Sequence, residues 1–261
     1  MLQIMTFNIR FQNDRDGANA WEFRRELVID LVRNHAPSIL GIQEGTTGQL
    51  RDLEKNLEGY DLFAPGRTWD ENCQYCSLFF RPDAVRPLFG SEFWLSATPE
   101  VHGSKGWDSA FPRMISYGIF REAESEVKSG GQFWAGVTHL DHLGTEARAR
   151  QAGIISEYLV KQGGPRILMG DFNDHPGSEA HRLLASAATG LVDTWEALRK
   201  PENESSMTYH KFTGVPQVFR MDWILASRDF AVSDARVIYD HGPGGRFPSD
   251  HFPYMVRLAR V

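Results

Sequence analysis

The sequence predicts an α/β fold, with two mixed β-sheets at its centre and helices outside them. Two rounds of strand and helix come first, then a run of strands, a further strand and helix, and terminal strands. This order favours two mixed sheets over one parallel, doubly wound sheet. The chain has 261 residues, 41% of them hydrophobic, which is enough for a substantial core. Because no repeat, low-complexity tract or linker divides it, we expect one domain over residues 1–261.

Two rounds of strand and helix fill the N-terminal part of the chain. Both expected strands are short apolar runs that end in polar residues, Asn8 in the first and Glu44 in the second. Pro37 closes the first helix, whose apolar residues recur at helical spacing. Glu44 also fits a second interpretation, in which its negative charge interacts favourably with the dipole at the N-terminus of the following helix. The expected strands cover residues 2–9 and 38–42, and the expected helices cover 20–34 and 49–57.

A run of strands follows, separated by loops that contain Gly, Pro and Asn. We expect these strands at about 60–64, 75–81, 84–95, 114–120 and 132–138. Gly130-Gly131 marks a hairpin between the last two strands. The segment 96–112 is rich in Gly, Ser and Pro, and long ordered loops are commonly functional. We therefore predict that it forms a wall of the functional pocket.

The C-terminal part contains one more strong strand and helix pattern before the terminal strands. The apolar run 167–169 stops at Gly170-Asp171, which is typical of a buried strand that emerges at a sheet edge. The polar region 196–217 shows little periodicity, so we expect surface loops there. The remaining elements are expected helices at 146–160 and 178–187, and expected strands at 221–226, 232–239 and 252–258.

The net charge of the chain restricts its expected binding partners, and its N-terminal sequence restricts its expected compartment. The formal net charge of -6 argues against a broad basic surface that holds long nucleic acid, and a small or short phosphorylated substrate fits better. The chain enters a strand-like run at once, without a charged leader, and it contains no run of about 18 apolar residues. We therefore expect a soluble, cytoplasmic protein without membrane insertion, unless a leader precedes this segment.

Two cysteines, Cys73 and Cys76, form an isolated Cys-x-x-Cys motif. Neither a second pair nor a histidine at zinc-finger spacing accompanies it, so we expect no metal site there. A redox motif needs a helix start, whereas strand-like residues follow these cysteines. The motif therefore favours reduced thiols with a packing role.

Polar side chains gather at the predicted strand ends, as a rigid active site requires. These side chains belong to Asn8, Glu44, His139, Asp171, Asn173, Asp250 and His251. Asp222 lies in an apolar run, where a buried carboxylate needs a cationic or donor partner. The oxygens of Glu44, Asn8 and Asp250 suit Mg²⁺ or Mn²⁺ better than zinc, which points to phosphoryl-transfer chemistry.

Six segments, in their order along the chain, resemble the endonuclease/exonuclease/phosphatase superfamily, which includes apurinic endonucleases, deoxyribonuclease and nocturnin-like deadenylases. They are TFNIR at 6–10, QE at 43–44, THLDH at 138–142, GDFN at 170–173, RMDWIL at 220–225 and SDH at 249–251. Residues 93–113 also resemble the small bacterial branch of this superfamily. The resemblance covers nearly the whole chain and implies a four-layer α/β/β/α sandwich with its site at one edge.

The resemblance also implies a role for each matching residue. The implied roles are metal binding by Glu44, Asn8 and Asp250, catalysis by Asp171, Asn173, Asp222, His139 and His251, and phosphate binding by Arg113, His139 and Asn173. Asp171 would orient or deprotonate the attacking water, and Asp222 would orient His251. The sequence leaves open whether Asp171 or His251 is the general base.

These observations predict a Mg²⁺- or Mn²⁺-dependent phosphoesterase that hydrolyses a phosphate mono- or diester by in-line attack of an activated water. Its partner would be a phosphorylated small molecule or a short nucleic acid, and no obligate protein partner is evident. A catalytically inactive binding module on the same fold is the alternative. A cysteine redox protein, indifferent to EDTA, is a third hypothesis. The sequence does not choose among a sugar phosphate, a nucleotide, a nucleic acid and a lipid head group.

Several other polar residues have a simpler structural interpretation. Asp141 and His142 fit capping or loop positions as well as a functional site. Arg148 fits the solvated face of a helix. His102 and His210 are expected in surface loops.

Overall fold

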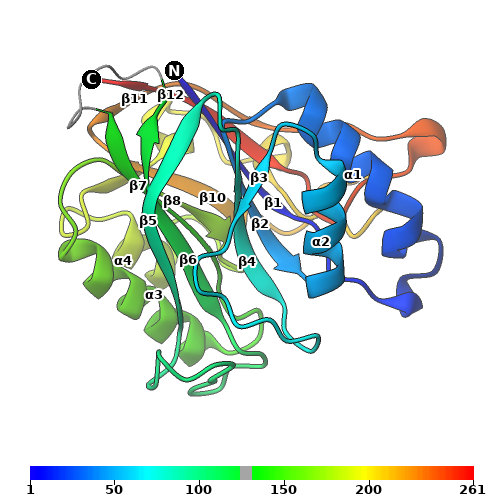
Figure 1. The fold of residues 1–261 in the computed structure, drawn as a ribbon. Coiled ribbons are helices and arrows are strands. Elements are labelled where there is room, and N and C mark those ends of the chain that lie inside the picture. Colours follow the sequence, from blue (N-terminus) through cyan, green and yellow to red (C-terminus); the bar gives the residue numbers. More distant parts are fainter. Residues whose placement is uncertain (124–130) are drawn as a thin grey trace.

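Two six-stranded β-sheets pack face to face, and helices lie on the outer side of each sheet (Figure 1). The computed structural model describes residues 1–123 and 131–261. The longer helices are α1 (Trp21–His35) and α2 (Thr47–Asn56) on one side, and α3 (Thr145–Val160) with the shorter α4 (Glu179–Leu184) on the other. The predicted four-layer α/β/β/α sandwich with two mixed sheets is confirmed.

The first sheet contains both chain termini, with the strand order β11-β12-β1-β2-β4-β3. Its strands are β1 (Leu2–Asn8), β2 (Ile39–Gly45), β3 (Asp61–Phe63), β4 (Tyr75–Phe80), β11 (Phe230–Val237) and β12 (Tyr254–Arg260). β1 and β2 are parallel, and the other neighbours in this sheet are antiparallel. Parallel strands end at the same edge of a sheet, so Asn8 and Glu44 emerge side by side.

The second sheet has the strand order β5-β6-β7-β8-β10-β9. Its strands are β5 (Val85–Trp94), β6 (Met114–Glu122), β7 (Gln132–His139), β8 (Arg166–Asp171), β9 (Leu191–Asp193) and β10 (Asp222–Ser227). β7 and β8 form the parallel pair here, and they end in His139 and Asp171. β1 packs on β8, and β2 on β7 and β8, across the interface between the sheets. The polar ends of all four strands therefore meet at one edge of the sandwich.

The start of α2 is fixed by a capping box that also holds the segment after β1. Thr46 Oγ1 accepts from Gln49 N, and Gln49 Oε1 accepts from Thr46 N at 3.2 Å. The same Gln49 side chain donates to Arg10 O at 2.8 Å and accepts from Gln12 N at 2.9 Å. The helix cap thus positions the backbone that leaves Asn8.

The expected elements correspond to the observed ones except in the polar and short segments. The expected helix at 178–187 is wrong at its end, because α4 stops at Leu184. The hydroxyls of Ser186 and Thr189 donate to Leu183 O at 3.1 Å and to Leu184 O at 2.6 Å, which replaces the helical amide partners. The turn expected at Gly130-Gly131 falls partly outside the described residues.

The region 196–217 is not made of surface loops alone, which corrects the prediction. It includes the end of α5 (Thr194–Ala197) and a 3-10 helix, Glu204–Ser206. His210, expected at the surface, is fully buried, and its ring stacks on Phe252 with the ring centroids 3.8 Å apart. The histidine is buried because this segment packs under the loop before β12. No local sequence pattern predicts that packing.

Within the described ranges, no helix combines the length and the apolar character that a membrane span would need.

Candidate active site

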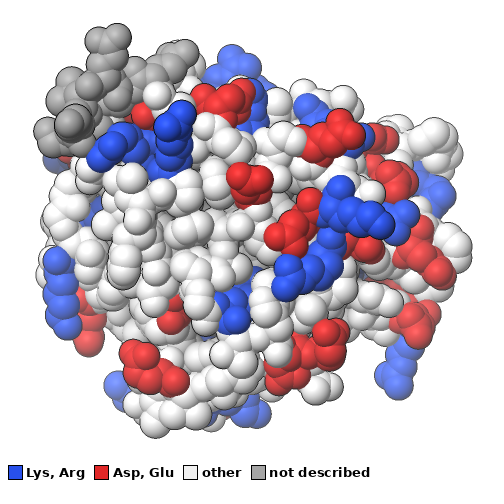
Figure 2. Space-filling model, in the orientation of Figure 1, with Lys and Arg blue, Asp and Glu red and all other residues white. Residues whose placement is uncertain are grey.

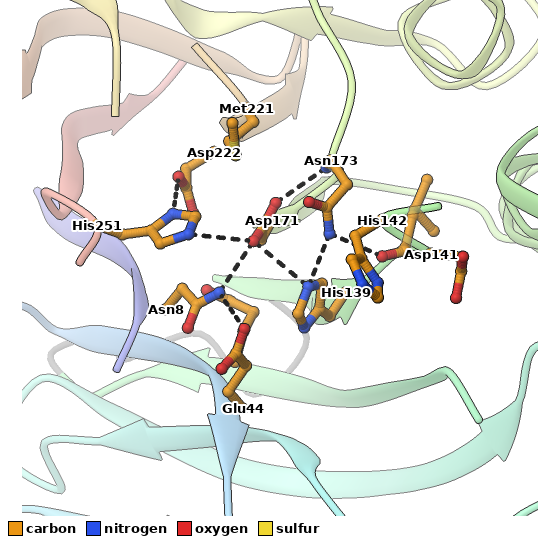
Figure 3. Close-up of polar contacts among 12 residues, drawn as sticks. Asn8, Glu44, His139, Asp141, His142, Asp171, Asn173, Met221, Asp222 and His251 are labelled. Atoms are coloured by element: carbon orange, nitrogen blue, oxygen red, sulfur yellow. Dashed lines mark hydrogen bonds and ion pairs between the residues drawn. The ribbon is translucent and has the colours of Figure 1, made fainter. Parts of the chain in front are cut away.

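All the predicted site residues lie together at the edge where β1, β2, β7 and β8 end, as Figure 3 shows for most of them. A pocket of about 260 Å³ opens at this edge. The predicted residues that line it are Glu44, Arg113, His139, Asp171, Asn173, Asp250 and His251. Asn8 and Asp222 lie behind this lining, both buried, and they contact Asp171 and His251 respectively.

Asp171 lies at the centre of the contacts in Figure 3 and is buried at the end of β8. Its Oδ2 accepts from Asn8 Nδ2 at 2.9 Å and lies 3.4 Å from His139 Nε2 and 3.8 Å from His251 Nε2. Its Oδ1 accepts from Asn173 N at 2.9 Å. Both oxygens are thus held in place, while the carboxylate still faces the pocket.

The glycine before Asp171 allows β8 to approach β7 closely. A Cβ atom on Gly170 would lie 2.2 Å from Thr138 O, a backbone atom of the neighbouring strand. Only glycine avoids this overlap. The register places Thr138 opposite Gly170 and His139 opposite Asp171, so the close approach brings the two catalytic candidates together.

Asp222 and His251 form a buried pair, which gives Asp222 the partner that a buried carboxylate needs and that the resemblance implies. Asp222 Oδ2 lies 2.9 Å from His251 Nδ1. This contact leaves Nε2 as the imidazole atom that faces Asp171. Asp222 is also directly opposite Asp171 in the antiparallel register of β8 and β10, so two carboxylates occupy neighbouring positions of the sheet.

The charges in this cluster shift the pKa values of both partners. Burial, followed by the charge of Asp222, raises the pKa of the Asp171 carboxyl. Burial on its own would lower the pKa of His251, but the charges of Asp222 and Asp171 outweigh it and raise that pKa. His251 is therefore held as a cation. The pKa of Asp171 lies closer to neutral pH than that of an ordinary aspartate.

Asn173 joins the ends of β7 and β8 through its side chain. Its Nδ2 lies 2.8 Å from His139 Nε2 and donates to Leu140 O at 3.0 Å. Burial, and then the charge of Arg113, lowers the pKa of His139 well below its usual value. The imidazole of His139 is therefore neutral, which suits a hydrogen-bonding role beside Asp171.

Glu44 points into the pocket because β2 bends just before it. The register of β2 with β4 shifts between Ile42 and Gly45, and Glu44 has a left-handed backbone with φ 64. Its Oε1 accepts from Asn8 Nδ2 at 3.0 Å, and its Oε2 accepts from Phe11 N at 3.0 Å. The bulge thus turns a strand residue into a fixed carboxylate at the rim.

The oxygen donors at this end of the pocket fit a hard divalent cation. Glu44 and Asp250 both line the pocket. Burial and the negative charge of Glu44 raise the pKa of Asp250, and they outweigh the positive charge of His251, which would lower it. Two carboxylates that repel each other are stabilised by a shared cation, and oxygen ligands suit Mg²⁺ or Mn²⁺. Asn8 Oδ1 accepts from Arg10 N at 3.0 Å, so direct coordination by Asn8 stays a prediction.

Of the described residues, Arg113 is one of two arginines that line the pocket. Its NH2 nitrogen lies 3.2 Å from His142 Nδ1, and its Nε lies 3.6 Å from Asp141 Oδ2. The ring of His142 stacks on Phe111, with the ring centroids 5.7 Å apart. A guanidinium fixed in this way is well suited to an anionic ligand such as a phosphate.

Asp141 is a structural residue, in line with one of its two interpretations. It is fully buried, its Oδ2 accepts from Ser109 Oγ and Ala110 N, both at 2.9 Å, and its Oδ1 accepts from Gly144 N at 2.7 Å. Arg148, expected on a solvated helix face, instead donates to Asp141 O at 2.8 Å, and its side chain is only 13% exposed. That expectation was wrong because Arg148 lies against the segments that follow β7 and β8, where its Nε is also 3.5 Å from Asp174 Oδ2.

The pocket also contains residues that the sequence analysis did not name as candidate site residues. They are Phe11, Gln74, Phe111, Tyr209, Val218 and Met221, together with Arg10. All lie in loops or next to strand ends, where no periodicity marks the direction of a side chain. Three of them carried some signal: Phe111 lies inside the segment 96–112 predicted as a pocket wall, and Arg10 and Met221 lie in segments that resemble the superfamily.

Comparison with known proteins agrees with the observed fold. The model of the endonuclease/exonuclease/phosphatase family matches residues 5–251. A protein of that family from Bacteroides thetaiotaomicron is 31% identical, with a TM-score of 0.85 over 98% of this chain and 97% of that chain. A mannosyl-6-phosphatase from the same organism is 30% identical, with a TM-score of 0.84 over 99% of this chain and 100% of that chain.

A more distant relative is longer than this chain. Nocturnin from Mus musculus is 25% identical over an alignment of 285 positions, gaps included, which covers 97% of this chain and 63% of nocturnin. The chain therefore spans less than two thirds of that relative.

Proposed function

Because this chain belongs to the endonuclease/exonuclease/phosphatase family, we propose that it is a divalent-metal-dependent phosphoesterase that hydrolyses a phosphate ester by attack of water. The observation that carries the proposal is the buried Asp171, which faces the pocket between two imidazoles, in a lining that also contains the guanidinium of Arg113. A packed core gains nothing from such a cluster, whereas water activation beside a phosphate requires it.

The ion would be held by Glu44 and Asp250, with Asn8 fixing the orientation of Glu44. Bound Mg²⁺ or Mn²⁺ would neutralise charge on the phosphate oxygens. The two Glu44 oxygens each accept one hydrogen bond, from Asn8 and from Phe11, which leaves lone pairs for a ligand. Rigid placement of the carboxylate is what an ion site of this type needs.

Asp171 is the general base in our proposal. A base near neutral pH needs a pKa that is raised towards the working pH, and burial and Asp222 act on Asp171 in that direction. His251 is less suited to the role, because Asp222 binds its Nδ1 and keeps the ring protonated. The water oxygen would form a new bond to phosphorus while the ester bond on the opposite side breaks.

The remaining residues would stabilise charge on the phosphate. His251 as a cation and Arg113 as a guanidinium both line the pocket and would donate to phosphate oxygens. Asn173 steadies His139 and the end of β8 through its contacts with His139 Nε2 and Leu140 O. Together these donors favour a phosphate that gains negative charge during the reaction.

We propose a phosphorylated small molecule, in particular a sugar phosphate monoester, as the substrate. The support is the mannosyl-6-phosphatase relative, which matches this chain over its whole length, and a pocket of modest volume, about 260 Å³. On the face shown in Figure 2, acidic and basic side chains are interspersed, and the net charge is -6. A small anion that enters one pocket needs no extended basic surface, whereas a long nucleic acid does.

The proposal is tested by assaying the purified protein on p-nitrophenyl phosphate, bis(p-nitrophenyl) phosphate, a panel of sugar phosphates and short oligonucleotides. Each substrate is measured with Mg²⁺, with Mn²⁺ and with EDTA. We expect metal-dependent release of phosphate from a sugar phosphate that EDTA abolishes. Absence of hydrolysis of every substrate with both metals would support an inactive binding module instead, and preference for oligonucleotides would overturn the substrate assignment.

A further inference from the structure

A second group of ligand-type side chains lies outside the pocket, where two loops from opposite sheets meet. Asp70 and Cys73 belong to the loop between β3 and β4 of the first sheet, and His102 belongs to the loop between β5 and β6 of the second. Cys73 Sγ lies 3.7 Å from Asp70 Oδ2 and 3.8 Å from His102 Nε2, and those two atoms are 3.7 Å apart. The three atoms form an almost equilateral triangle.

The size of this triangle matches the coordination shell of one metal ion. In an equilateral triangle, the distance from the centre to each corner equals the edge length divided by √3. For these three atoms that distance is about 2.2 Å. Zinc binds cysteine sulfur at about 2.3 Å, histidine nitrogen at about 2.0–2.1 Å and carboxylate oxygen at about 2.0–2.2 Å. An ion at the centre would therefore lie within about 0.2 Å of these bond lengths from all three atoms, and small side-chain rotations would complete the fit.

The surroundings keep these atoms directed at one another. Asp70 Oδ1 accepts from Asn72 N at 2.8 Å and from Asn72 Nδ2 at 3.1 Å, so Oδ2 is the oxygen that faces the cysteine and the histidine. The ring of His102 packs edge-on against Trp94, with the ring centroids 5.2 Å apart. Among the described residues, Asp70 makes no ion pair with an arginine or lysine that would compete with a metal ion.

The identity of the ligand atoms selects the ion. One thiolate, one imidazole and one carboxylate suit Zn²⁺, whereas the oxygen donors of the pocket suit Mg²⁺ or Mn²⁺. The side chains of Asp70 and His102 are 37% and 35% exposed, so an ion can reach them from solvent. Cys76, the other cysteine of the motif, is buried in β4 and is not part of the cluster.

We propose that Asp70, Cys73 and His102 form a Zn²⁺ site that ties the two loops together, with the fourth position open to water. The thiol of Cys73 would lose its proton to solvent on binding. Gln74, next to Cys73, lines the active-site pocket, and the other loop carries Phe111 and ends at Arg113. The ion would therefore fix both walls of the pocket without contacting the substrate.

The test uses Co²⁺ as a spectroscopic substitute for Zn²⁺ in the full chain, stripped of metal with EDTA and kept reduced. We expect a thiolate-to-cobalt charge-transfer band that saturates at one equivalent, and its loss on addition of equimolar Zn²⁺. Because neither Cys73 nor Cys76 lines the pocket, a thiolate band reports only the proposed site. Cys73→Ser should abolish it, whereas Cys76→Ser and Asp171→Asn should retain it. No band in the unmodified chain, or a band that survives in Cys73→Ser, would overturn the proposal.

A second measurement covers the case in which Cys73→Ser disturbs the loop. Asp70→Asn and His102→Gln keep the thiol and the approximate side-chain shape, and each should weaken Zn²⁺ binding at least tenfold in competition with a chromogenic chelator. Glu71→Gln, a change of one exposed acid beside Asp70, is the matched control and should leave the affinity unchanged. Equal affinity in all these variants would show that the cluster is held by hydrogen bonds alone.

Discussion

Glu44 and Asn173, two of the residues that line the pocket, have left-handed backbone conformations. Glu44 has φ 64 and Asn173 has φ 51, values that side chains other than glycine rarely adopt. Such conformations cost about 1 kcal/mol or more and persist where the surroundings enforce them. Glu44 lies in the bulge of β2, and Asn173 lies in a turn closed by Asp171 Oδ1. The chain therefore bends where two side chains must turn towards the same ligand.

Asp171→Asn tests the assignment of the base at the scale of one residue. The amide keeps the shape of the carboxylate but cannot take a proton from water, so kcat should fall by about 10² to 10⁴-fold. Folding should be intact by circular dichroism. The matched control is Asp174→Asn, three residues along the chain and outside the pocket lining, which should keep its activity. Near-normal kcat in Asp171→Asn would refute the assignment.

Asp222→Asn tests the electrostatic coupling through the pH profile. The charge of Asp222 raises the pKa of both Asp171 and His251, so its removal should lower both. If Asp171 must be ionised and His251 protonated, both limbs of the kcat/KM profile should move to lower pH in the variant. The measurement is kcat/KM against pH at saturating metal. Limbs that stay in place while the rate falls would indicate a role in packing only.

Among the elements, the β7–β8 pair depends on a glycine. Because a Cβ on Gly170 would lie 2.2 Å from Thr138 O, Gly170→Ala should force the strands apart and reduce the free energy of unfolding by about 2 kcal/mol or more. Gly153→Ala is the matched control, since nothing lies within 4 Å of its Cβ position in α3. It should stabilise the protein by about 0.5–1 kcal/mol. Urea unfolding measures both, and equal effects would contradict the explanation.

The loop at 96–112 is attached to the end of β7 by Asp141. Burial would raise the pKa of this carboxyl, but hydrogen bonds from Gly144, Leu143 and Ser109, and the charge of Arg113, bring it to about 2. Asp141→Asn places an NH₂ group against buried donors, so we expect a loss of about 3 kcal/mol at pH 7.

The pH dependence of this loss has a defined sign. The folded pKa lies below the unfolded one, so the ionised form stabilises the wild type above about pH 4, and this contribution fades as the pH falls towards about 2. The difference in unfolding free energy between wild type and Asp141→Asn should shrink over the same range. Asp61→Asn, an exposed residue on β3, should change stability by less than about 0.5 kcal/mol at every pH. A loss that does not vary with pH would argue against the ionised hydrogen-bonded state.

On the scale of the whole molecule, both sheets contribute to one site. Asn8 and Glu44 come from the first sheet, whereas His139, Asp171 and Asp222 come from the second. Asn8 joins the two halves directly, because its amide donates to Glu44 on one side and to Asp171 on the other. The proposed metal ligands and the proposed base are therefore brought into range only when the sheets pack face to face.

The fold was predictable because its strands and helices follow clear hydrophobic periods. β8, for example, is an apolar run that ends at Asp171, and the buried position of Asp222 indicated that it needed a partner. The partner itself came from the resemblance, since nothing near Asp222 in the sequence points to His251. His210 and Arg148 were misplaced because their burial depends on segments distant in the chain. A single domain over residues 1–261 stays a prediction.

The facing carboxylates of Asp171 and Asp222 have a consequence for protein engineering. Like charges opposite each other on neighbouring strands destabilise a sheet, and the raised pKa of Asp171 means that its ionised form weakens the folded state above about pH 4. Selection for thermal stability alone would therefore enrich neutral residues at position 171 and yield proteins that are more stable but inactive. Directed evolution of this scaffold needs an activity screen at every round.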